Sequence, residues 1–520
     1  MNLSLARRAS IFAAGALSLT LATKAYAGPA DLDPRWGGTG KVSTDVDGTN
    51  TNDDRIVRVL PSHDGGLIAL ANVRKSDGDY SAVVRYTAAG RLDSTFGTAG
   101  HVILPHNQQP GLPACSSQET RAGALQADGK IVLTVVCRPQ DHSSQPAYLN
   151  VVRLNADGNF DTSFGDAGHV YDRLGGTVGF MGDVVPSDLA LSRDGKIVVP
   201  FHYFEDDSRL DNYGVARFNA DGSRDTTFAF RRTAGTEGAR VAVQSDGKVL
   251  VTGRDNPFTP YGIFRLNADG SSDTTFGGPI FTGSIALDVI NENGVEARIS
   301  GVSNMVVQPD GKFLVAGNAR FSGSTQDDIF VARFNPNGSP DTTFHQNGAV
   351  VTDVAGGDDG ASRVAIQQNG QIVVGGYATL PADGGAGSLG VAVLRYNADG
   401  SLDTAWNGNG IARFDNTTSY ETLNDLAIGP TGRVFVASTP PAANAHDLFT
   451  FALRGTRVCQ EGSRIMSNEE EFSIADNQAA DSGCQLANTG AGHKGLAGYL
   501  MLALGAVIAR RRLRRQSARA

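Results

Sequence analysis

The stretch Asn267-Ala-Asp-Gly-Ser-Ser-Asp-Thr-Thr-Phe276 recurs along the chain and decides the fold. Close copies begin at Asn155, Asn219, Asn335 and Asn397, and worn copies lie at 87–96 and 32–36. The aspartate opening the second half recurs seven times with a mean period of about 62 residues, at Asp33, Asp93, Asp161, Asp225, Asp273, Asp341 and Asp403. Such a period is typical of repeat architectures, in which each repeat supplies one supersecondary unit.

Each unit also carries a second phrase, seen at Val307-Gln-Pro-Asp-Gly-Lys-Phe-Leu-Val315. Asp-Gly between two short β-branched runs predicts a hairpin with a type I′ turn, in which both central residues adopt positive φ. Two more short apolar runs complete the unit. One of them commonly reads apolar-x-Arg-aromatic, as at Phe330–Phe334, so the arginine and its neighbours alternate between strand faces.

Four short strands in each of seven units, without an amphipathic helix, predict an all-β fold: a seven-bladed β-propeller of four-stranded antiparallel blades over residues 31–456. The Phe or Trp that ends the first phrase would plug the space between blades. The chain opens on a fourth-strand phrase and closes on a third strand. The N-terminal strand is therefore expected to complete the last blade and hide two sheet edges. A β-solenoid fits several Asp-Gly hairpins per repeat poorly.

Both phrases resemble those of the delta-60 repeat family of bacterial β-propellers, over roughly residues 31–454. The resemblance implies a propeller on a secreted or surface protein. It implies no reaction, because the activity of that family is itself undefined.

The charge of the chain argues against several partners. The formal net charge of the 520 residues is −9, and it becomes −19 if the basic segments 1–27 and 490–520 are removed. A polyanion of this size repels nucleic acid and anionic lipid. We expect a monomer.

The N-terminus reads as an export signal. Arg7 and Arg8 precede the apolar run 11–22, and Ala25-Tyr26-Ala27 forms a small-x-small cleavage site. We expect cleavage between Ala27 and Gly28, which would place the propeller outside the cytoplasm.

The C-terminus resembles a sortase cell-wall sorting signal of the Leu-Ala-x-Thr-Gly type used by class E sortases, with a short apolar segment (496–509) and an arginine-rich end. The motif comprises Leu486, Ala487, Asn488, Thr489 and Gly490. The resemblance implies a sortase partner, cleavage after Thr489, only transient membrane contact and attachment to the wall. A Gram-negative surface signal and a tail anchor are the alternatives, and release from the cell is a further outcome.

Four cysteines behind an export signal predict two disulfides. Hairpin pairing across Asp128-Gly129 would place Cys137 opposite Thr120, within reach of Cys115. The other pair, Cys459–Cys484, would close an acidic stalk over residues 457–489.

Connections that vary between units locate a binding face. Segments 105–121, 281–304, 203–213 and 377–390 vary, and in a propeller all open on one rim, where acidic pairs such as Asp327-Asp328 and Asp358-Asp359 lie. We therefore expect a non-enzymatic binding scaffold for a glycan or protein. A hydrolase or lyase with carboxylates in the central channel, or a passive spacer, are the alternatives.

The tightest polar constellation is Asn-x-Asp-Gly-x-x-Asp, whose oxygens resemble a calcium loop. Its best copies are Asn155, Asp157 and Asp161, and Asn267, Asp269 and Asp273. The alternative is an Asx-type turn in which the side chains bond the backbone. No other cofactor is expected, and no catalytic motif is visible.

Overall fold

The computed structural model describes residues 30–455 except 47, 49–53, 107–114, 140–146, 173–182, 205–210, 229–230, 235–239, 255–259, 278–282, 288, 293–294, 346, 383–384, 415–421 and 439–446. These residues belong to the first of two compact units, Met1–Thr456. In the part of the chain that is described, every regular element is a β-strand, and no helix is long and apolar enough to cross a membrane.

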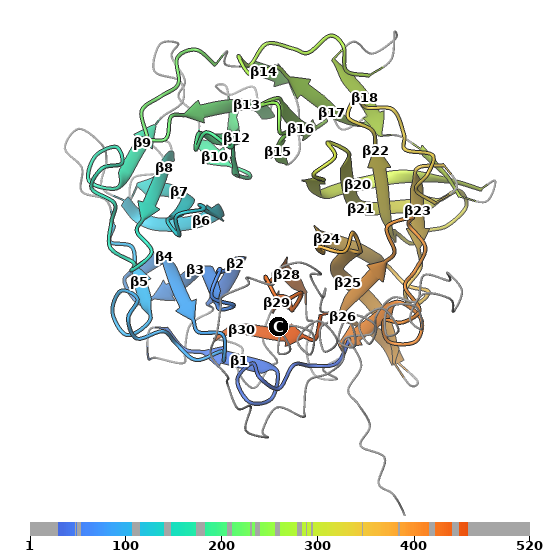
Figure 1. Ribbon diagram of the computed structural model, residues 1–520, viewed down its shortest axis with the longest axis horizontal. Helices are drawn as coiled ribbons and strands as arrows, with labels where there is room; N and C mark the ends of the chain where they lie inside the picture. Colours follow the sequence, from blue (N-terminus) through green and yellow to red (C-terminus); the bar gives the residue numbers. More distant parts are fainter. Residues whose placement is uncertain are drawn as a thin grey trace, which may run out of the picture. The chain divides into compact units, whose positions relative to one another are not determined.

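Seven antiparallel sheets follow one another around a ring, as predicted (Figure 1). Blade 1 contains β2 (Arg55–Pro61), β3 (Leu67–Lys75), β4 (Gly78–Tyr86) and β5 (His101–Ile103), and blade 2 contains β6 (Cys115–Leu125), β7 (Ile131–Pro139), β8 (Tyr148–Leu154) and β9 (His169–Asp172). Blade 3 contains β10 (Val184–Pro186), β11 (Ala190–Leu191), β12 (Ile197–Phe204), β13 (Asp211–Phe218) and β14 (Arg231–Ala234), and blade 4 contains β15 (Val241–Val243), β16 (Val249–Gly253), β17 (Tyr261–Leu266) and β18 (Ser284–Leu287).

The remaining blades follow the same plan. Blade 5 contains β19 (Val289–Glu292), β20 (Val295–Val307), β21 (Phe313–Phe321), β22 (Asp328–Phe334) and β23 (Ala349–Thr352), and blade 6 contains β24 (Asp359–Ile366), β25 (Ile372–Ala382), β26 (Gly385–Tyr396) and β27 (Ile411–Phe414). Blade 7 contains β28 (Leu423–Ile428), β29 (Val434–Ser438), β30 (Leu448–Leu453) and the N-terminal β1 (Lys41–Thr44).

The Asp-Gly phrase forms the predicted hairpin, but with a different turn. In blade 5 the Gln308 N–H donates to the Lys312 carbonyl (2.7 Å) and the Gly311 N–H to the Gln308 carbonyl (3.0 Å). Gly311 has φ +85°, whereas Asp310 does not have positive φ. A three-residue loop with only its glycine in the left-handed region matches the right-handed twist of the strands at less steric cost than a type I′ turn. The type I′ prediction was therefore wrong.

The aromatic residue of the first phrase packs between blades, as predicted. Phe344 is fully buried, and its cluster includes Leu314 and Ile329 from blade 5 and Val364 and Ile372 from blade 6. The guanidinium of Arg333 lies 4.7 Å from the centre of the Phe344 ring.

Arg333 also bonds blade 6, and within blade 5 it forms an ion pair with Asp341 that we call the Arg–Asp latch. Its Nε donates to Oδ2 of Asp341 (2.7 Å) and its Nη1 to the carbonyl of Ala398, while the Lys312 ammonium bonds the same carboxylate oxygen (2.8 Å). Equivalent pairs recur at Arg85–Asp93, Arg153–Asp161, Arg217–Asp225, Arg265–Asp273 and Arg395–Asp403.

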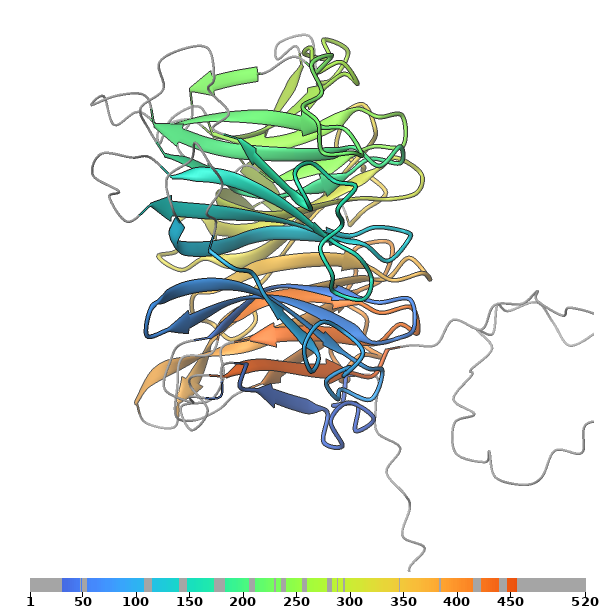
Figure 2. The ribbon, with the colours of Figure 1, turned by 90° about the vertical axis from the view of Figure 1, so that its left-hand side faces the viewer.

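The N-terminal strand closes the ring, as predicted. β1 pairs with β30 from Lys41↔Phe451 to Thr44↔Leu448, and Figure 2 shows this blue strand beside the orange C-terminal strands. Ala452 occupies the latch arginine's place in blade 7. Arg433, which stands where other units have the hairpin lysine, replaces it: it bonds Asp33 and the carbonyl of Ala88 in blade 1, each at 2.8 Å.

The disulfide Cys115–Cys137 is present, with a Cα–Cα separation of 5.5 Å. The predicted register was wrong, because Cys137 pairs with Gln118 rather than Thr120. The three-residue turn between Gln126 and Lys130 shifts the pairing by one position, and a β-bulge between Thr120 and Ala122 shifts it by another. A second bulge between Cys115 and Ser117 brings Cys115 opposite Pro139. Cys459 and Cys484 lie outside the described residues.

Candidate functional site

A large cavity lies on blades 4 and 5, between the end of β16 and the ends of β20 and β21. It has a volume of about 930 Å³, and we call it the rim pocket. Its lining residues are Arg254, Glu296, Arg298, Ile299, Ser300, Arg320, Phe321, Ser322, Gly323 and Ser324. Within segment 281–304, one of the variable connections predicted to build a binding face, β19 and β20 form an extra hairpin, and β20 supplies one wall.

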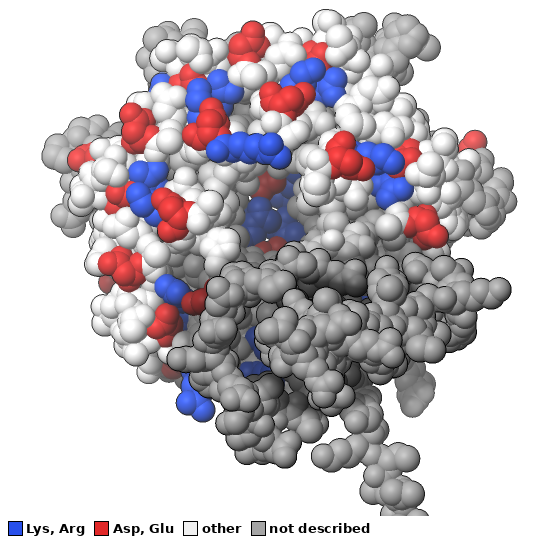
Figure 3. Space-filling view, in the orientation of Figure 1, with Lys and Arg blue, Asp and Glu red and all other residues white. Residues whose placement is uncertain are grey.

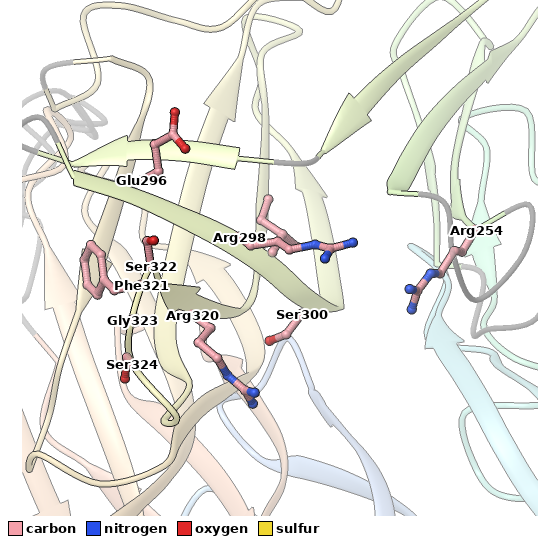
Figure 4. A pocket seen from close by; sticks show the side chains of 10 residues that line it. Arg254, Glu296, Arg298, Ser300, Arg320, Phe321, Ser322, Gly323 and Ser324 are labelled. Carbon is pink, nitrogen blue, oxygen red and sulfur yellow. The ribbon is translucent and has the colours of Figure 1, made fainter.

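Three guanidinium groups line the rim pocket. Arg298 on β20 is the direct cross-strand partner of Arg320 on β21. Arg254 follows β16 and lies across the pocket, so that its side chain and that of Arg298 point toward one another (Figure 4). Like charges at directly opposite strand positions destabilise a sheet, so this pairing is not explained by the fold.

All three arginines already have interacting neighbours. Arg320 bonds Asp327 at 2.8 Å, and this hydrogen bond and charge raise the pKa of Arg320. The guanidinium of Arg254 lies 5.0 Å from the Tyr261 ring. Glu296 is the one acid among the lining residues that the structure describes. Three cations with serine hydroxyls and one aromatic ring suit an anionic, hydroxyl-bearing ligand.

A second charged cluster lines the central channel. In every blade, one residue faces the channel from the first strand, six places before the Asp, Asn or Thr of the hairpin turn. In blades 1 to 7 these residues are Arg58, Ala122, Asp188, Arg240, Asn304, Arg363 and Asp425. We call this set the channel ring. Hydrogen-bond acceptors occupy blades 3, 5 and 7, and arginines occupy blades 4, 6 and 1.

Each acceptor of the channel ring bonds a backbone N–H of the next acceptor-free blade on the ring. Asp188 accepts from the Val241 N–H (3.2 Å), Asn304 from the Val364 N–H (3.1 Å) and Asp425 from the Val59 N–H (2.7 Å). Alternation of donors and acceptors cannot close in a ring of seven, and the break falls at Ala122 in blade 2.

The small side chain of Ala122 lets Arg58 bond Asp188 across blade 2 at 2.6 Å. Asp425 is in turn bonded by Arg363 and lies 3.9 Å from Arg58. Both carboxylates of the channel ring are thus occupied by guanidinium groups and backbone amides. They do not form the free carboxylate pair that glycoside hydrolysis uses.

The channel ring carries one excess positive charge, from three arginines and two aspartates. Burial and the charge of Arg58 lower the pKa of Arg363 to about 10, even though Asp425 opposes this shift. Nε of Arg58, Nε of Arg240 and Nη1 of Arg363 are buried without a hydrogen-bond partner among the described residues. Blue and red atoms are visible in the hollow at the centre of the ring (Figure 3). The channel therefore favours anions over cations.

The predicted calcium residues carry other hydrogen bonds in this structure. Oδ1 of Asp157 accepts from the Asn159 N–H (3.0 Å) and Oδ1 of Asp269 from the Ser271 N–H (2.9 Å), which is the Asx-turn geometry. Asp161 is the latch aspartate of Arg153 and also bonds Lys130. Burial alone would raise its pKa, but hydrogen bonds from Ser163 and Lys130 and the charge of Arg153 hold the pKa well below its usual range.

The other predicted calcium residues repeat this pattern. Asp273 bonds Arg265 and Lys248. Asn267 donates to the Ser271 hydroxyl (3.0 Å), and Asn155 closes its turn through the Asn159 carbonyl (2.8 Å). Calcium binding there would have to compete with these bonds.

Several predicted segments lie outside the described residues. They are the export signal with Ala27 and Gly28, the stalk, and the sorting motif 486–490 with its apolar segment. Sequence reasoning missed the rim arginines. Of the three, only Arg298 lies in a segment that the sequence marks as variable, and Arg254 and Arg320 lie outside both those segments and the repeated phrases.

The repeats match a known family. Five segments match a family model described as "Domain of unknown function (DUF5122) beta-propeller", at residues 126–164, 204–228, 244–276, 308–344 and 367–405. They fall in blades 2 to 6, one in each blade. No curated protein matches the sequence.

Solved structures show distant similarity. The GH93 α-L-arabinofuranosidase of Fusarium graminearum is 12% identical, with a TM-score of 0.35, over 78% of this chain and 95% of that one. The polysaccharide lyase Uly1 is 11% identical, with a TM-score of 0.42, over 77% and 90%. Sqt1 of Chaetomium thermophilum is 11% identical, with a TM-score of 0.37, over 78% and 96%. Similarity at this level carries no argument about ligand or reaction, so function must be argued from the site.

Proposed function

We propose that this chain is an exported, surface-attached propeller that binds an acidic glycan in the rim pocket. The observation that carries the proposal is the convergence of Arg254, which follows β16, with Arg298 on β20 and Arg320 on β21. A guanidinium fork matches a carboxylate or sulfate group in a bidentate geometry.

The rest of the rim pocket favours a sugar over a peptide. Its volume of about 930 Å³ is within the usual range for small-ligand sites. Ser300, Ser322 and Ser324 can bond ring hydroxyls, and Phe321 can pack on the apolar face of a sugar ring.

Titration calorimetry of the full chain with an oligouronate, a neutral oligosaccharide of the same length and an acidic peptide tests the proposal. We expect binding to the oligouronate only. Because a charge-assisted hydrogen bond contributes about 1.5–3 kcal/mol, Arg298→Gln should weaken that binding roughly ten- to hundred-fold. Arg91→Gln removes the same charge from a hairpin-side turn on the opposite rim and should change Kd less than about twofold.

Binding to the acidic peptide alone would indicate a protein partner in place of a glycan. Equal losses of affinity in Arg298→Gln and Arg91→Gln would refute the rim pocket as the binding site. Assays for new reducing ends or unsaturated products test the hydrolase or lyase alternative. If neither binding nor turnover is detected, the passive-spacer alternative is favoured.

The surface location is part of the proposal and rests on the export and sorting motifs. Mass spectrometry of wall-linked peptides should find a fragment ending at Thr489. A protein that retains residues 490–520 in the membrane fraction would instead indicate a tail anchor.

A further inference from the structure

Three carboxylates meet on the same rim, at the boundary of blades 5 and 6. Asp328 begins β22, Asp353 follows β23 and Asp359 begins β24. One oxygen from each lies within 4.8 Å of the others. Two of the three come from the acidic pairs noted in the sequence, and the third comes from the connection between the blades.

Asp328 is the member that the fold does not explain. It is only 7% exposed, and its carboxylate makes no hydrogen bond or ion pair with any described residue. Strand register makes Asp447 its equivalent in blade 7, since Leu448 pairs with Thr44 as Ile329 pairs with Thr352. There the Ser43 hydroxyl donates to Asp447 at 2.7 Å, whereas Val351 stands at the corresponding place in blade 5. Leaving a buried carboxylate without a donor is costly unless a cation binds it.

The other two carboxylates are held in place by backbone amides. Asp359 accepts from the N–H groups of Val354 (2.6 Å) and Thr379 (3.2 Å). Asp353 accepts from the Gly356 N–H at 2.5 Å. Arg320 pairs with the adjacent Asp327, and no Lys or Arg among the described residues forms an ion pair with the three acids.

We propose that Asp328, Asp353 and Asp359 form a calcium site that joins blade 5 to blade 6. The donors are all oxygens, and they come from two blades. Ca²⁺ accepts such sets with variable geometry, Mg²⁺ demands near-octahedral geometry, and Zn²⁺ prefers nitrogen and sulfur ligands. Because Asp327 lies next to Asp328 and bonds Arg320, the site also stiffens the side of the rim pocket formed by β21 and β22.

Thermal melting of the full chain, stripped with EDTA and titrated with CaCl₂, tests the site without any glycan. At a calcium concentration of one hundred times Kd, we expect Tm to rise by about 3 °C for a domain of this size. Asp328→Asn should abolish the rise. The control Asp269→Asn alters an Asn-x-Asp-Gly turn, where the copy in blade 5 already has Asn337, and should keep the rise in full.

The melting temperature of the variant in EDTA shows whether it folds. In EDTA, Asp328→Asn removes mutual repulsion and should melt at or above the temperature of the wild-type chain. A calcium response that survives Asp328→Asn, one that disappears with Asp269→Asn, or no response in the wild-type chain would overturn the site. An equal rise with MgCl₂ would overturn the assignment to calcium.

Discussion

Replacing Asp341 with Asn should destabilise the whole propeller, because one carboxylate neutralises two cations at a blade boundary. Oδ2 of Asp341 bonds Arg333 (2.7 Å) and Lys312 (2.8 Å), and Oδ1 accepts from the Thr343 N–H (3.1 Å) and hydroxyl (2.7 Å). The residue is only 3% exposed. An amide of the same shape keeps the Thr343 bonds but leaves Arg333 buried without a counter-charge.

Removing one partner of a buried ion pair costs about 3–5 kcal/mol. With an unfolding entropy of about 2.1 cal/mol/K per residue, a domain of roughly 425 residues loses about 1 °C of Tm for each 0.9 kcal/mol. Asp341→Asn should therefore lower Tm by about 3–6 °C.

Differential scanning calorimetry at pH 7 measures this shift, and the urea midpoint provides a second reading. Asp310→Asn is the matched control, because it removes the same charge from a hairpin turn where blade 6 naturally has Asn369. The control should stay within about 1 °C of the wild-type chain, as is usual for surface changes. If the two variants melt at the same temperature, the latch contributes no stability and the reasoning fails.

Three further predictions concern the latch aspartates, the channel ring and the disulfide. The pKa values of Asp161, Asp225, Asp273 and Asp341 are all held below the ordinary value of 3.8, since hydrogen bonds and neighbouring cations outweigh burial. Their contribution is therefore complete above that value and is lost below it, so the urea midpoint should fall as pH drops from about 4 to 2; a midpoint that rises over this range would contradict the assignment. Asp425→Asn should lower the free energy of unfolding by about 3–5 kcal/mol, because it leaves Arg58 and Arg363 in the channel ring without this counter-charge. Calorimetry should show a fall in Tm several-fold larger than that of Asp310→Asn. Replacing both Cys115 and Cys137 by Ser opens a loop with a sequence separation of 22 and should cost about 3 kcal/mol, read as a lower Tm with unchanged far-UV circular dichroism; an unchanged Tm would show that the pair adds no stability.

The repeat architecture could be predicted from the sequence because local chemistry is copied in every unit. The glycine hairpins, the buried Phe344 and the out-of-phase first strand each have a signature visible in a single segment. The turn type could not be predicted, because Asp-Gly satisfies both a type I′ turn and the observed three-residue loop. The partner of Cys137 was misplaced by one position because the turn has three residues, and by another because a bulge leaves no mark in the hydrophobic pattern.

The candidate sites depended on contacts between units, which the repeat pattern does not encode. Arg298 faces Arg320 because β20 pairs with β21 as far as Ala297↔Phe321, well beyond the repeated phrase. Asp353 joins Asp328 only across β22 and β23. The channel ring lies at a fixed offset from the hairpin, but the sequence alone did not single it out, because its pairing across Ala122 depends on how seven positions meet around one axis.

The pairing of β1 with β30 has a consequence for how the molecule comes apart. In an open repeat array, the outermost units contact one neighbour and fray first. Here every blade has two neighbours, and the Asp33–Arg433 bond ties the first described residues to the last sheet. Unfolding therefore has no weak end from which to start, and separating any one pair of blades opens the circle for all of them. A single sharp melting transition, without a stepwise loss of blades, is the behaviour that this closure imposes.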